Sequence, residues 1–396
     1  MRQVYLDYAA TTPTDAEVVS AMQPFFTERF GNPSSLYTLG QEARAAVENS
    51  RKIGADFLGA KPKEVLFTSG ATESLNQAIK GVAEARGMVN GGLKLINGKA
   101  PHIITTLIEH HAVLHTCQHL ERLGFSVTYL PVNQEGLVEV RSLKEALTDQ
   151  TIMVSVMYVN NEVGTIQPIA EIGKAVKEKS KEIVFLTDAA QAAGYLDCAV
   201  DQLGVDMLAI AGHKIYAPKG VGIFYVRSGT LWIPQQDGGG QEYRRRAGTE
   251  NVPYIVGLAR AMQLVQENKE EVNNRLTHLR NKLIKEVLAR VPRSHLNGSQ
   301  EQRVPSNANF SFKNVEGESL LLMLDQEGIY VSTGSACSSG TLEPSHVLTA
   351  MGLTPEIAHG SLRVSLGKYT SEEDINYFLE KLTPIVAKLR ETSPFK

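Results

Sequence analysis

Residues 151–188 read TIMVSVMYVNNEVGTIQPIAEIGKAVKEKSKEIVFLTD and contain one full unit of a pattern that recurs along much of the chain. The unit starts with an apolar run rich in β-branched residues, continues through a helical pattern at 169–182 and ends in a second apolar run at 183–188. Short apolar runs bounded by polar turns predict buried strands, and a helix between two of them is typical of a parallel β-α-β unit. These residues therefore predict an α/β fold with a mainly parallel sheet.

The same alternation extends outward from this unit, from about residue 60 to residue 230. Further strand candidates are EVLFTS (64–69), HIITTLI (102–108), SVTYLPV (126–132), MLAIAG (207–212) and GIFYV (222–226), with helical patterns at 72–87 and 112–124. After Val252 a long helical pattern at 255–291 leads into a region of shorter strands and helices. This change predicts a second, smaller α/β domain, whereas the Gly/Asn-rich residues 87–99 indicate a surface loop or insertion.

The composition is that of an ordinary soluble globular protein. The 396 residues are 42% hydrophobic and 21% charged, with a formal net charge of -3. A chain of this length is expected to form two domains, and without a basic excess we expect no nucleic-acid or acidic-membrane binding. The N-terminus shows no signal-peptide pattern, and no apolar stretch approaches the roughly 20 residues that span a bilayer. We therefore expect a cytoplasmic protein, or an organellar one from which a targeting segment was removed.

The three cysteines, Cys117, Cys198 and Cys337, form no CxxC pair and are too few for a disulfide framework or a cysteine-rich zinc site. We expect reduced thiols and no metal. Cys117 falls in a helical pattern and Cys198 in a loop after a strand, where packing explains them best. Cys337 instead lies in QEGIYVSTGSACSSGTLE (326–343), whose small residues give little reason to pack. An accessible thiol in a mobile loop favours a reactive or delivery role.

Polar or ionisable residues follow five of the predicted strands. In an open parallel sheet, ligands bind beyond the carboxyl ends of the strands, where the following loops converge. We therefore expect one cleft lined by Gly70-Ala71-Thr72, Glu109-His110, Asn160-Asn161-Glu162, Asp188 with Gln191, and His213-Lys214.

Each of these groups also has a plainer interpretation. The turn SGATES (69–74) offers free N–H groups and a helix dipole to a phosphate, although Ser, Gly and Thr also cap helices that bind nothing. His110, or its neighbour His111, is either a catalytic group or a residue that starts a helix. Asp188 follows an apolar run, so its carboxylate faces the cleft or caps a helix internally.

Two cations are equally open to two interpretations. Lys214 lies between two apolar strand candidates, where partial burial would lower the pKa of its amine and suit imine chemistry. The alternative is a lysine in a surface turn, as expected for Lys219. Arg363, in HGSLRVSLG (359–367), either holds a substrate carboxylate or forms a surface ion pair.

Taken together, these segments closely resemble the cysteine desulfurases, which are fold-type-I pyridoxal-phosphate enzymes of the aminotransferase class V group. The resemblance covers essentially the whole chain. It rests on the ordered motifs YLDYAATTP, FGNPSS, LFTSGATES, IEHHAVL, VNNEVG, TDAAQ, GHKIYAPKG, RRRAGTENV, GSACSSGTLEPSHVL and SLRVSLG. It implies a large domain (16–262) with a seven-stranded sheet between helices, and a small domain (1–15 and 263–396) that carries the cysteine loop (about 326–343).

The resemblance also implies a role for each residue around pyridoxal 5'-phosphate. Lys214 would form the internal Schiff base and move protons, Asp188 would pair with the pyridinium nitrogen, and His110 would stack on the ring. Asn161 and Gln191 would hydrogen-bond the ring hydroxyl. The phosphate would be bound by Ala71, Thr72 and His213, together with Thr249 from a second subunit. Arg363 and Asn161 would bind the substrate.

The implied reaction converts L-cysteine to L-alanine and transfers the sulfur to Cys337 as a persulfide. Thr249 in a neighbouring site implies a homodimer, and the persulfide implies a sulfur-acceptor protein such as an iron-sulfur scaffold or a thiolation enzyme. SACSSG resembles the long-loop branch of the family, and GGGQEYRRRAGTENV resembles its nitrogen-fixation-type members.

Two departures from the family pattern bear on these expectations. Ala211 replaces a serine whose hydroxyl contacts the phosphate in many relatives, so that contact is missing and cofactor binding is expected to be weaker. The chain ends at RETSPFK, without the extension that housekeeping members use near their scaffold partner, which puts that docking in doubt.

Other functions stay open. A selenocysteine lyase, a cystine C–S lyase or an aminotransferase would use the same cofactor with a different need for Cys337. A non-catalytic scaffold or sulfur-relay protein could keep the fold, but intact Lys214, Asp188, His110 and Cys337 argue against it.

Overall fold

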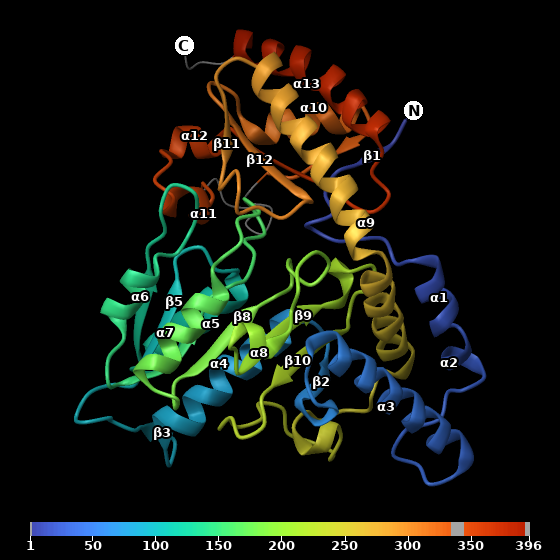
Figure 1. Ribbon diagram of the computed structural model, residues 1–396, viewed down its shortest axis with the longest axis vertical. Coiled ribbons are helices and arrows are strands. Elements are labelled where there is room, and N and C mark those ends of the chain that lie inside the picture. Colours follow the sequence, from blue (N-terminus) through green and yellow to red (C-terminus); the bar gives the residue numbers. More distant parts are fainter. Residues whose placement is uncertain (1, 334–343, 393–396) are drawn as a thin grey trace.

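The computed structural model describes residues 2–333 and 344–392. Figure 1 shows a larger lower lobe, built around a twisted sheet, and a smaller upper lobe. Helix α9 (Val252–Arg290) starts in the lower lobe and runs continuously into the upper one. The two lobes are called the large and the small lobe below.

The large lobe contains a seven-stranded sheet in which each of the seven predicted runs forms a strand. The order across the sheet is β2-β10-β9-β8-β7-β5-β6. Only β10 runs antiparallel to its two neighbours among these described strands, which confirms the mainly parallel sheet. The bounds are β2 Val65–Thr68, β5 His102–Thr106, β6 Ser126–Leu130, β7 Thr151–Ser155, β8 Val184–Asp188, β9 Met207–Ala211 and β10 Gly222–Val226.

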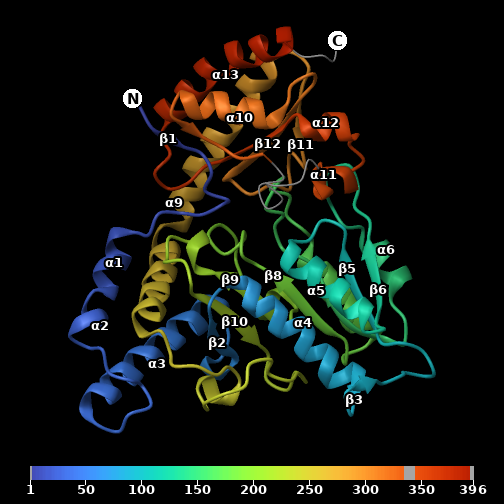
Figure 2. The same ribbon diagram turned by 180° about the vertical axis from the view of Figure 1, so that it is seen from behind.

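Helices cover both faces of this sheet, and most of its strands are therefore buried on both sides. In Figure 2, α4 (Ala71–Gly87) and α5 (His111–Arg122) lie in front of the sheet. The opposite face packs against α3 (Thr38–Leu58), α7 (Ile169–Lys179), α8 (Val200–Leu203) and the first half of α9. Shorter helices complete the lobe: α1 (Ala16–Met22), α2 (Pro24–Thr27) and α6 (Val140–Ala146).

The small lobe combines a three-stranded antiparallel sheet with helices. Its strands are β11 (Ser294–Asn297), β12 (Asn307–Phe312) and β14 (Ser361–Ser365), and its helices are α10 (Gly317–Gln326), α11 (His346–Ala350), α12 (Pro355–His359) and α13 (Glu372–Thr392). The N-terminal strand β1 (Val4–Tyr5) pairs in parallel with β13 (Ile329–Tyr330).

The predicted division into residues 16–262 and residues 1–15 with 263–396 stays a proposal, and the packing supports it. Val4 and Leu6 belong to the hydrophobic core of the small lobe, together with residues of α9 from Leu276 onward. The earlier part of α9, as far as Met262, packs in the core of the large lobe. Domain assignment by shared core therefore puts the N-terminus with the small domain.

Residues 87–99 form a small projection with more regular structure than the predicted loop. Met88–Val89 (β3) and Gly92–Leu93 (β4) pair as an antiparallel hairpin. Cys117 and Cys198 are both buried, as predicted, and burial raises the pKa of each thiol to about 12. None of the helices within the described residues is long and apolar enough to cross a membrane.

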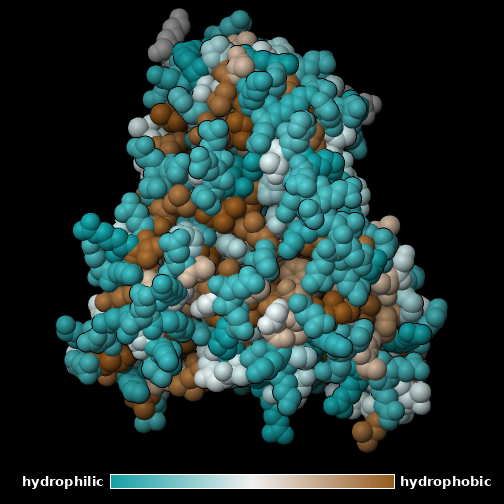
Figure 3. Space-filling view, in the orientation of Figure 1, coloured by the Kyte–Doolittle hydropathy of each residue, from teal (hydrophilic) through white to brown (hydrophobic). Residues whose placement is uncertain are grey.

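The loop after β7, in the large lobe, is hydrogen-bonded to the loop between β11 and β12, in the small lobe. Arg303 is 4% exposed and donates hydrogen bonds to the carbonyl oxygens of Val163 (2.7 Å), Ser299 (2.8 Å) and Asn297 (2.5 Å). Figure 3 shows hydrophobic residues gathered where the lobes meet. The loop that carries Asn161 is therefore held by contacts from both lobes.

Candidate active site

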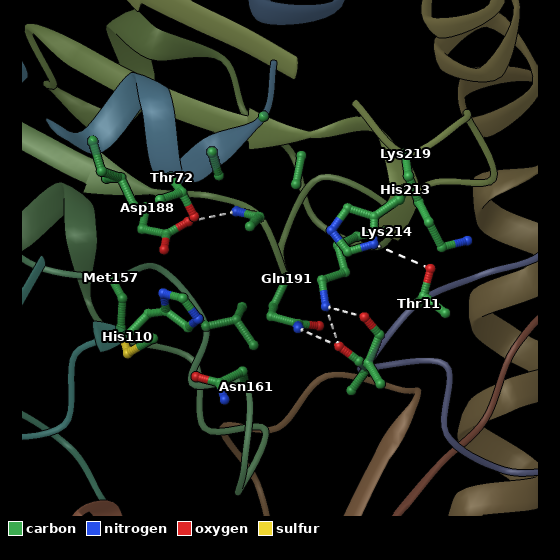
Figure 4. A pocket seen from close by; sticks show the side chains of 18 of the residues that line it. Thr11, Thr72, His110, Met157, Asn161, Asp188, Gln191, His213, Lys214 and Lys219 are labelled. Atoms are coloured by element: carbon green, nitrogen blue, oxygen red, sulfur yellow. Dashed lines mark hydrogen bonds between the residues drawn. The ribbon is translucent and has the colours of Figure 1, made fainter. Parts of the chain in front are cut away.

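A cavity of about 600 Å³ lies beyond the carboxyl ends of the strands, and all five predicted strand ends contribute to its wall. Several side chains point toward one another across it (Figure 4). The predicted residues that line it are Gly70, Ala71, Thr72, His110, Asn161, Asp188, Gln191, His213, Lys214 and Arg363, with Ala211 beside them. Glu109, Asn160 and Glu162 are not among the lining residues.

The N-terminus of α4 forms one end of the cavity. Gly70 has a φ of 150°, a value that other residues rarely adopt, and it lets the chain turn from β2 directly into the helix. Ala71 and Thr72 are the first two residues of this 17-residue helix, so their N–H groups have no acceptor within the helix. Open N–H groups and the positive end of the helix dipole fit a phosphate group.

Asp188 ends β8 with its carboxyl fully buried at the cavity. Burial raises the pKa of this carboxyl, while the N–H of Ala190 (2.9 Å from Oδ1), His110 and Lys214 act in the opposite direction. A buried carboxylate is stabilised by a cation placed beside it. A protonated ring nitrogen in the cavity would supply that cation, so the site fits pyridoxal phosphate here.

His110 is both a helix cap and a cavity residue, so its role as a cap is confirmed, and its predicted catalytic role stays a prediction. Its Nδ1 accepts the backbone N–H of Ala112 (3.1 Å) at the start of α5, which leaves Nε2 as the protonated nitrogen of the neutral ring. Burial is the largest cause that lowers the pKa of His110, although Asp188 raises it. A neutral imidazole with a fixed tautomer can exchange a proton with a bound group.

Lys214 faces a part of the wall that the sequence analysis did not predict. Its Nζ donates to the carbonyl oxygens of Ala9 (2.5 Å) and Ala10 (2.6 Å), and Gln191 Nε2 also donates to Ala9 O (2.9 Å). Lys219 lies at the edge of the same cavity but is exposed, as expected for a turn lysine. The small residues of YLDYAATTP were the available signal, because small side chains let backbone carbonyls approach a ligand.

Arg363 lies in β14, and its side chain, which is 3% exposed, lines the cavity. Its two terminal nitrogens donate to Asn161 O (3.0 Å) and Asp7 Oδ1 (2.8 Å). Its Nε has no hydrogen-bond partner among the described residues. A buried donor without a partner is costly, so this N–H fits an anionic group that enters the cavity.

Besides Glu109, Asn160 and Glu162, two further predicted residues are not among those that line this cavity. Thr249 is exposed and does not line the cavity of its own chain. Cys337 lies outside the described residues. His213 does line the cavity, where it bonds Thr11 Oγ1 (3.1 Å); burial and the neighbouring lysines lower its pKa to about 4.

Glu109 is buried directly behind the cavity. The strand ends predicted that it lines the cleft, and that prediction is wrong, because Glu109 is not among the lining residues. Its Oε1 accepts Thr106 Oγ1 (2.9 Å) and the N–H of Met157 (2.8 Å), whereas Oε2 has no partner among the described residues. Burial raises the pKa of this carboxyl to about 8. Glu109 is therefore expected to be protonated at neutral pH.

Replacing Glu109 by glutamine is expected to stabilise the protein at pH 8 and not at pH 4. In the unfolded chain the carboxyl of Glu109 has its ordinary pKa, whereas in the folded protein burial raises this pKa to about 8. The unfolded state thus binds fewer protons in this window, and the stability of the wild type falls as pH rises, by at most about 1.4 kcal/mol per pH unit. Denaturant unfolding at several pH values measures this effect.

Glu64→Gln is the matched control for that prediction. Burial raises the pKa of Glu64, but the N–H groups of Lys61 (3.0 Å) and Ser228 (2.8 Å) bond its carboxylate, and the net pKa is lowered. Its substitution should therefore destabilise the protein at pH 8. A Glu109→Gln variant that follows the pH profile of the wild type would contradict the buried proton.

Comparison with known proteins assigns the chain to a family. The model of the aminotransferase class-V family matches residues 4–378. The chain belongs to this family. A cysteine desulfurase IscS of Dictyoglomus turgidum is 53% identical over 395 residues, which cover 100% of this chain and 97% of that protein. The resemblance to the cysteine desulfurases is thereby confirmed.

Solved structures agree with this family assignment. A NifS-like protein has a TM-score of 0.90 and 40% identity, covering 98% of this chain and 100% of its own. SspA in complex with cysteine has a TM-score of 0.79 and 37% identity, covering 93% and 100%. Enzymes of this class-V family depend on pyridoxal 5'-phosphate, which fits the wall described above. Within the described residues no group of His, Cys, Asp and Glu could hold a metal ion.

Proposed function

We propose that this protein is a pyridoxal-phosphate-dependent cysteine desulfurase. The observation that carries the proposal is the single cavity in which Lys214, Asp188, His110 and the N-terminus of α4 meet. The IscS of Dictyoglomus turgidum, which is 53% identical over the full length of this chain, supports the choice of reaction. The bound cofactor supplies an electron sink that stabilises negative charge at the substrate Cα.

The residues of the wall divide the binding of the cofactor between them. The N–H groups of Ala71 and Thr72 bind the phosphate, with His213 nearby. Asp188 keeps the ring nitrogen protonated, and the side chains of Asn161 and Gln191 bond the ring hydroxyl. Lys214 would hold the cofactor covalently through its amine.

Arg363 orients the substrate. Its Nε–H donates to the carboxylate of L-cysteine, with Asn161 beside it, while Asp7 holds the other side of the guanidinium. This contact places Cα near Lys214 and His110. Lys214 then removes the Cα proton, and His110 moves a proton through Nε2, because Nδ1 is occupied by the N–H of Ala112.

Cys337 accepts the sulfur. Its thiolate attacks the substrate sulfur, the Cβ–S bond breaks, and the electron pair stays with the carbon skeleton, which takes up a proton to become L-alanine. The thiol of Cys337 becomes a persulfide, so L-cysteine and Cys337-SH give L-alanine and Cys337-S-SH. A nucleophile in a segment rich in small residues can afterwards present the persulfide to an acceptor protein.

The assembly and the partners belong to the same proposal. Thr249 is exposed and lies outside its own cavity, which suits a contact with the phosphate of a second subunit in a homodimer. The acceptor is a protein such as an iron-sulfur scaffold or a thiolation enzyme. Iron-sulfur assembly agrees with the IscS name of the relatives.

The products formed from L-cysteine test the reaction. The cofactor-loaded wild type with a thiol reductant is expected to release L-alanine and sulfide in equal amounts. Mass spectrometry of the protein before reduction should find one additional sulfur atom on Cys337. Pyruvate with ammonia in place of alanine would instead show a C–S lyase, and a protein that binds no cofactor would revive the scaffold interpretation.

A further inference from the structure

The described chain resumes at residue 344, and the residue after it makes a buried contact with the loop after β7, next to the cavity-lining Asn161. Ser345 caps α11, because its Oγ accepts the N–H of Leu348 (3.2 Å). The same hydroxyl donates to Glu162 Oε2 at 2.5 Å. Glu162 and Ser345 are each 4% exposed, so water cannot replace this bond without opening the structure.

Glu162 is itself held firmly in the loop after β7. Its N–H donates to Asn160 Oδ1 (2.9 Å), and its carbonyl oxygen accepts Nδ2 of Asn307 (3.2 Å) and of Asn309 (3.1 Å). Burial raises the pKa of the carboxyl to about 7, although Ser345 and Arg363 lower it. Burying a carboxyl group costs free energy that an apolar side chain of similar size would not cost. Glu162 therefore does more than fill space, and its carboxyl makes a specific hydrogen bond to Ser345.

The start of α11 is fixed at two further points on the large lobe. His346 Nε2 bonds the carbonyl oxygen of Glu109 (3.0 Å), the residue before His110. The helix also shares a buried hydrophobic cluster with the strand-end loops, made of Ile108, Met157, Val163, Val347, Leu348, Met351 and Ala358. The chain after residue 343 is thus attached to the loops that carry His110 and Asn161.

The chain before residue 334 is attached to a different wall. Ser332 and Arg363 exchange backbone hydrogen bonds of 3.2 Å and 2.7 Å in the middle of β14. The last described residues before the cysteine therefore pair with β14, whereas the first ones after it contact the loops that follow β5 and β7. The described residues on the two sides of the cysteine are thus attached to different elements around the same cavity.

We propose that Glu162 is a positioning residue for sulfur transfer, which acts by holding Ser345 against the loop after β7 that also carries Asn161. The proposal rests on the desulfurase function above. Glu162 touches neither the cofactor nor the substrate, because it does not line the cavity. Its loss should impair the attack by Cys337 while the steps at the substrate Cα continue.

Two rates measured on the cofactor-loaded enzyme separate these effects. The first is alanine release from L-cysteine, which needs Cys337. The second is exchange of the Cα proton of L-alanine with deuterium oxide, which needs Lys214 but no sulfur acceptor. Glu162→Ala is expected to lower the first rate about 10- to 100-fold, as for loss of a buried charge-assisted hydrogen bond, and to leave the second within about twofold.

Conservative and matched variants test the contact itself. Glu162→Gln keeps an acceptor for Ser345 and should retain alanine release within about threefold of the wild type, as a neutral acceptor replaces a charged one. Ser345→Ala should resemble Glu162→Ala. Ser371→Ala removes a serine that caps α13 through the N–H of Asp374 (3.2 Å) and should leave both rates unchanged.

Each outcome decides the proposal. Equal alanine release from Glu162→Ala and wild type overturns it, and so does an equal loss of both rates, which shows a general disturbance of the cavity. Should Glu162→Ala fail to fold, the contrast between Ser345→Ala and Glu162→Gln decides in its place. A wild type that releases no alanine overturns the desulfurase function and this inference together.

Discussion

Replacing Lys214 by alanine is expected to leave less than about one thousandth of the wild-type rate of alanine release from L-cysteine. The substitution removes the only amine that we assign both to the covalent attachment of the cofactor and to the transfer of the Cα proton. No other amine takes its place among the residues that line the cavity, since Lys219 is exposed at the edge. Alanine release and the visible absorbance of the cofactor measure the effect.

A small primary amine sharpens this experiment. Methylamine should restore part of the lost rate, because a cavity of about 600 Å³ has room for it where the lysine side chain was. Lys219→Ala is the matched control and should remain within about threefold of the wild type, as expected for an exposed charge. A Lys214→Ala variant that keeps more than about one tenth of the rate would remove Lys214 from the mechanism.

Replacing Cys337 by alanine is expected to abolish alanine release to a similar extent, because the substrate sulfur then has no acceptor. The Cα proton exchange of L-alanine should continue in this variant, since Lys214 and His110 are intact. That combination of results is specific to a sulfur acceptor. Parallel assays of the two rates on the same preparation measure it.

Cys117→Ala provides the control for Cys337→Ala. Cys117 is buried in α5 with a thiol pKa raised to about 12, so it carries no reactive thiolate at neutral pH. Its substitution should leave alanine release within a few-fold of the wild type. Equal alanine release from Cys337→Ala and wild type would reject transfer through Cys337 and favour the lyase or aminotransferase alternatives.

The local sequence predicted the parallel sheet and the wall of the cavity for the same reason. Each strand of the large sheet is a short apolar run, and most of the cavity-lining groups lie at the end of such a run or in the loop after it, as Asp188 follows residues 184–187. Parallel strands place these ends at one edge without any knowledge of packing. The interpretation of His110 as either a cap or a functional residue was too narrow, because a side chain at a strand end can cap the next helix and face the cavity.

Contacts between residues far apart in the sequence could not be predicted from local patterns. The bond from Lys214 to Ala9 O joins residues 205 positions apart, and Glu162 and Ser345 are 183 positions apart. No periodicity or turn signal encodes such a pair. The burial of Glu109, which shifts its pKa to about 8, likewise depends on what packs around it.

The sequence by itself thus determined the order of strands and helices, the family motifs and the residue types at the carboxyl edge of the sheet. These features depend on side-chain period and on neighbours along the chain. Only the tertiary structure decided that the N-terminal segment faces Lys214, and that the residues flanking the cysteine attach to different elements, β14 on one side and the loops after β5 and β7 on the other. Those features depend on how separate elements close around one cavity, where burial and hydrogen bonding between remote residues set the energy.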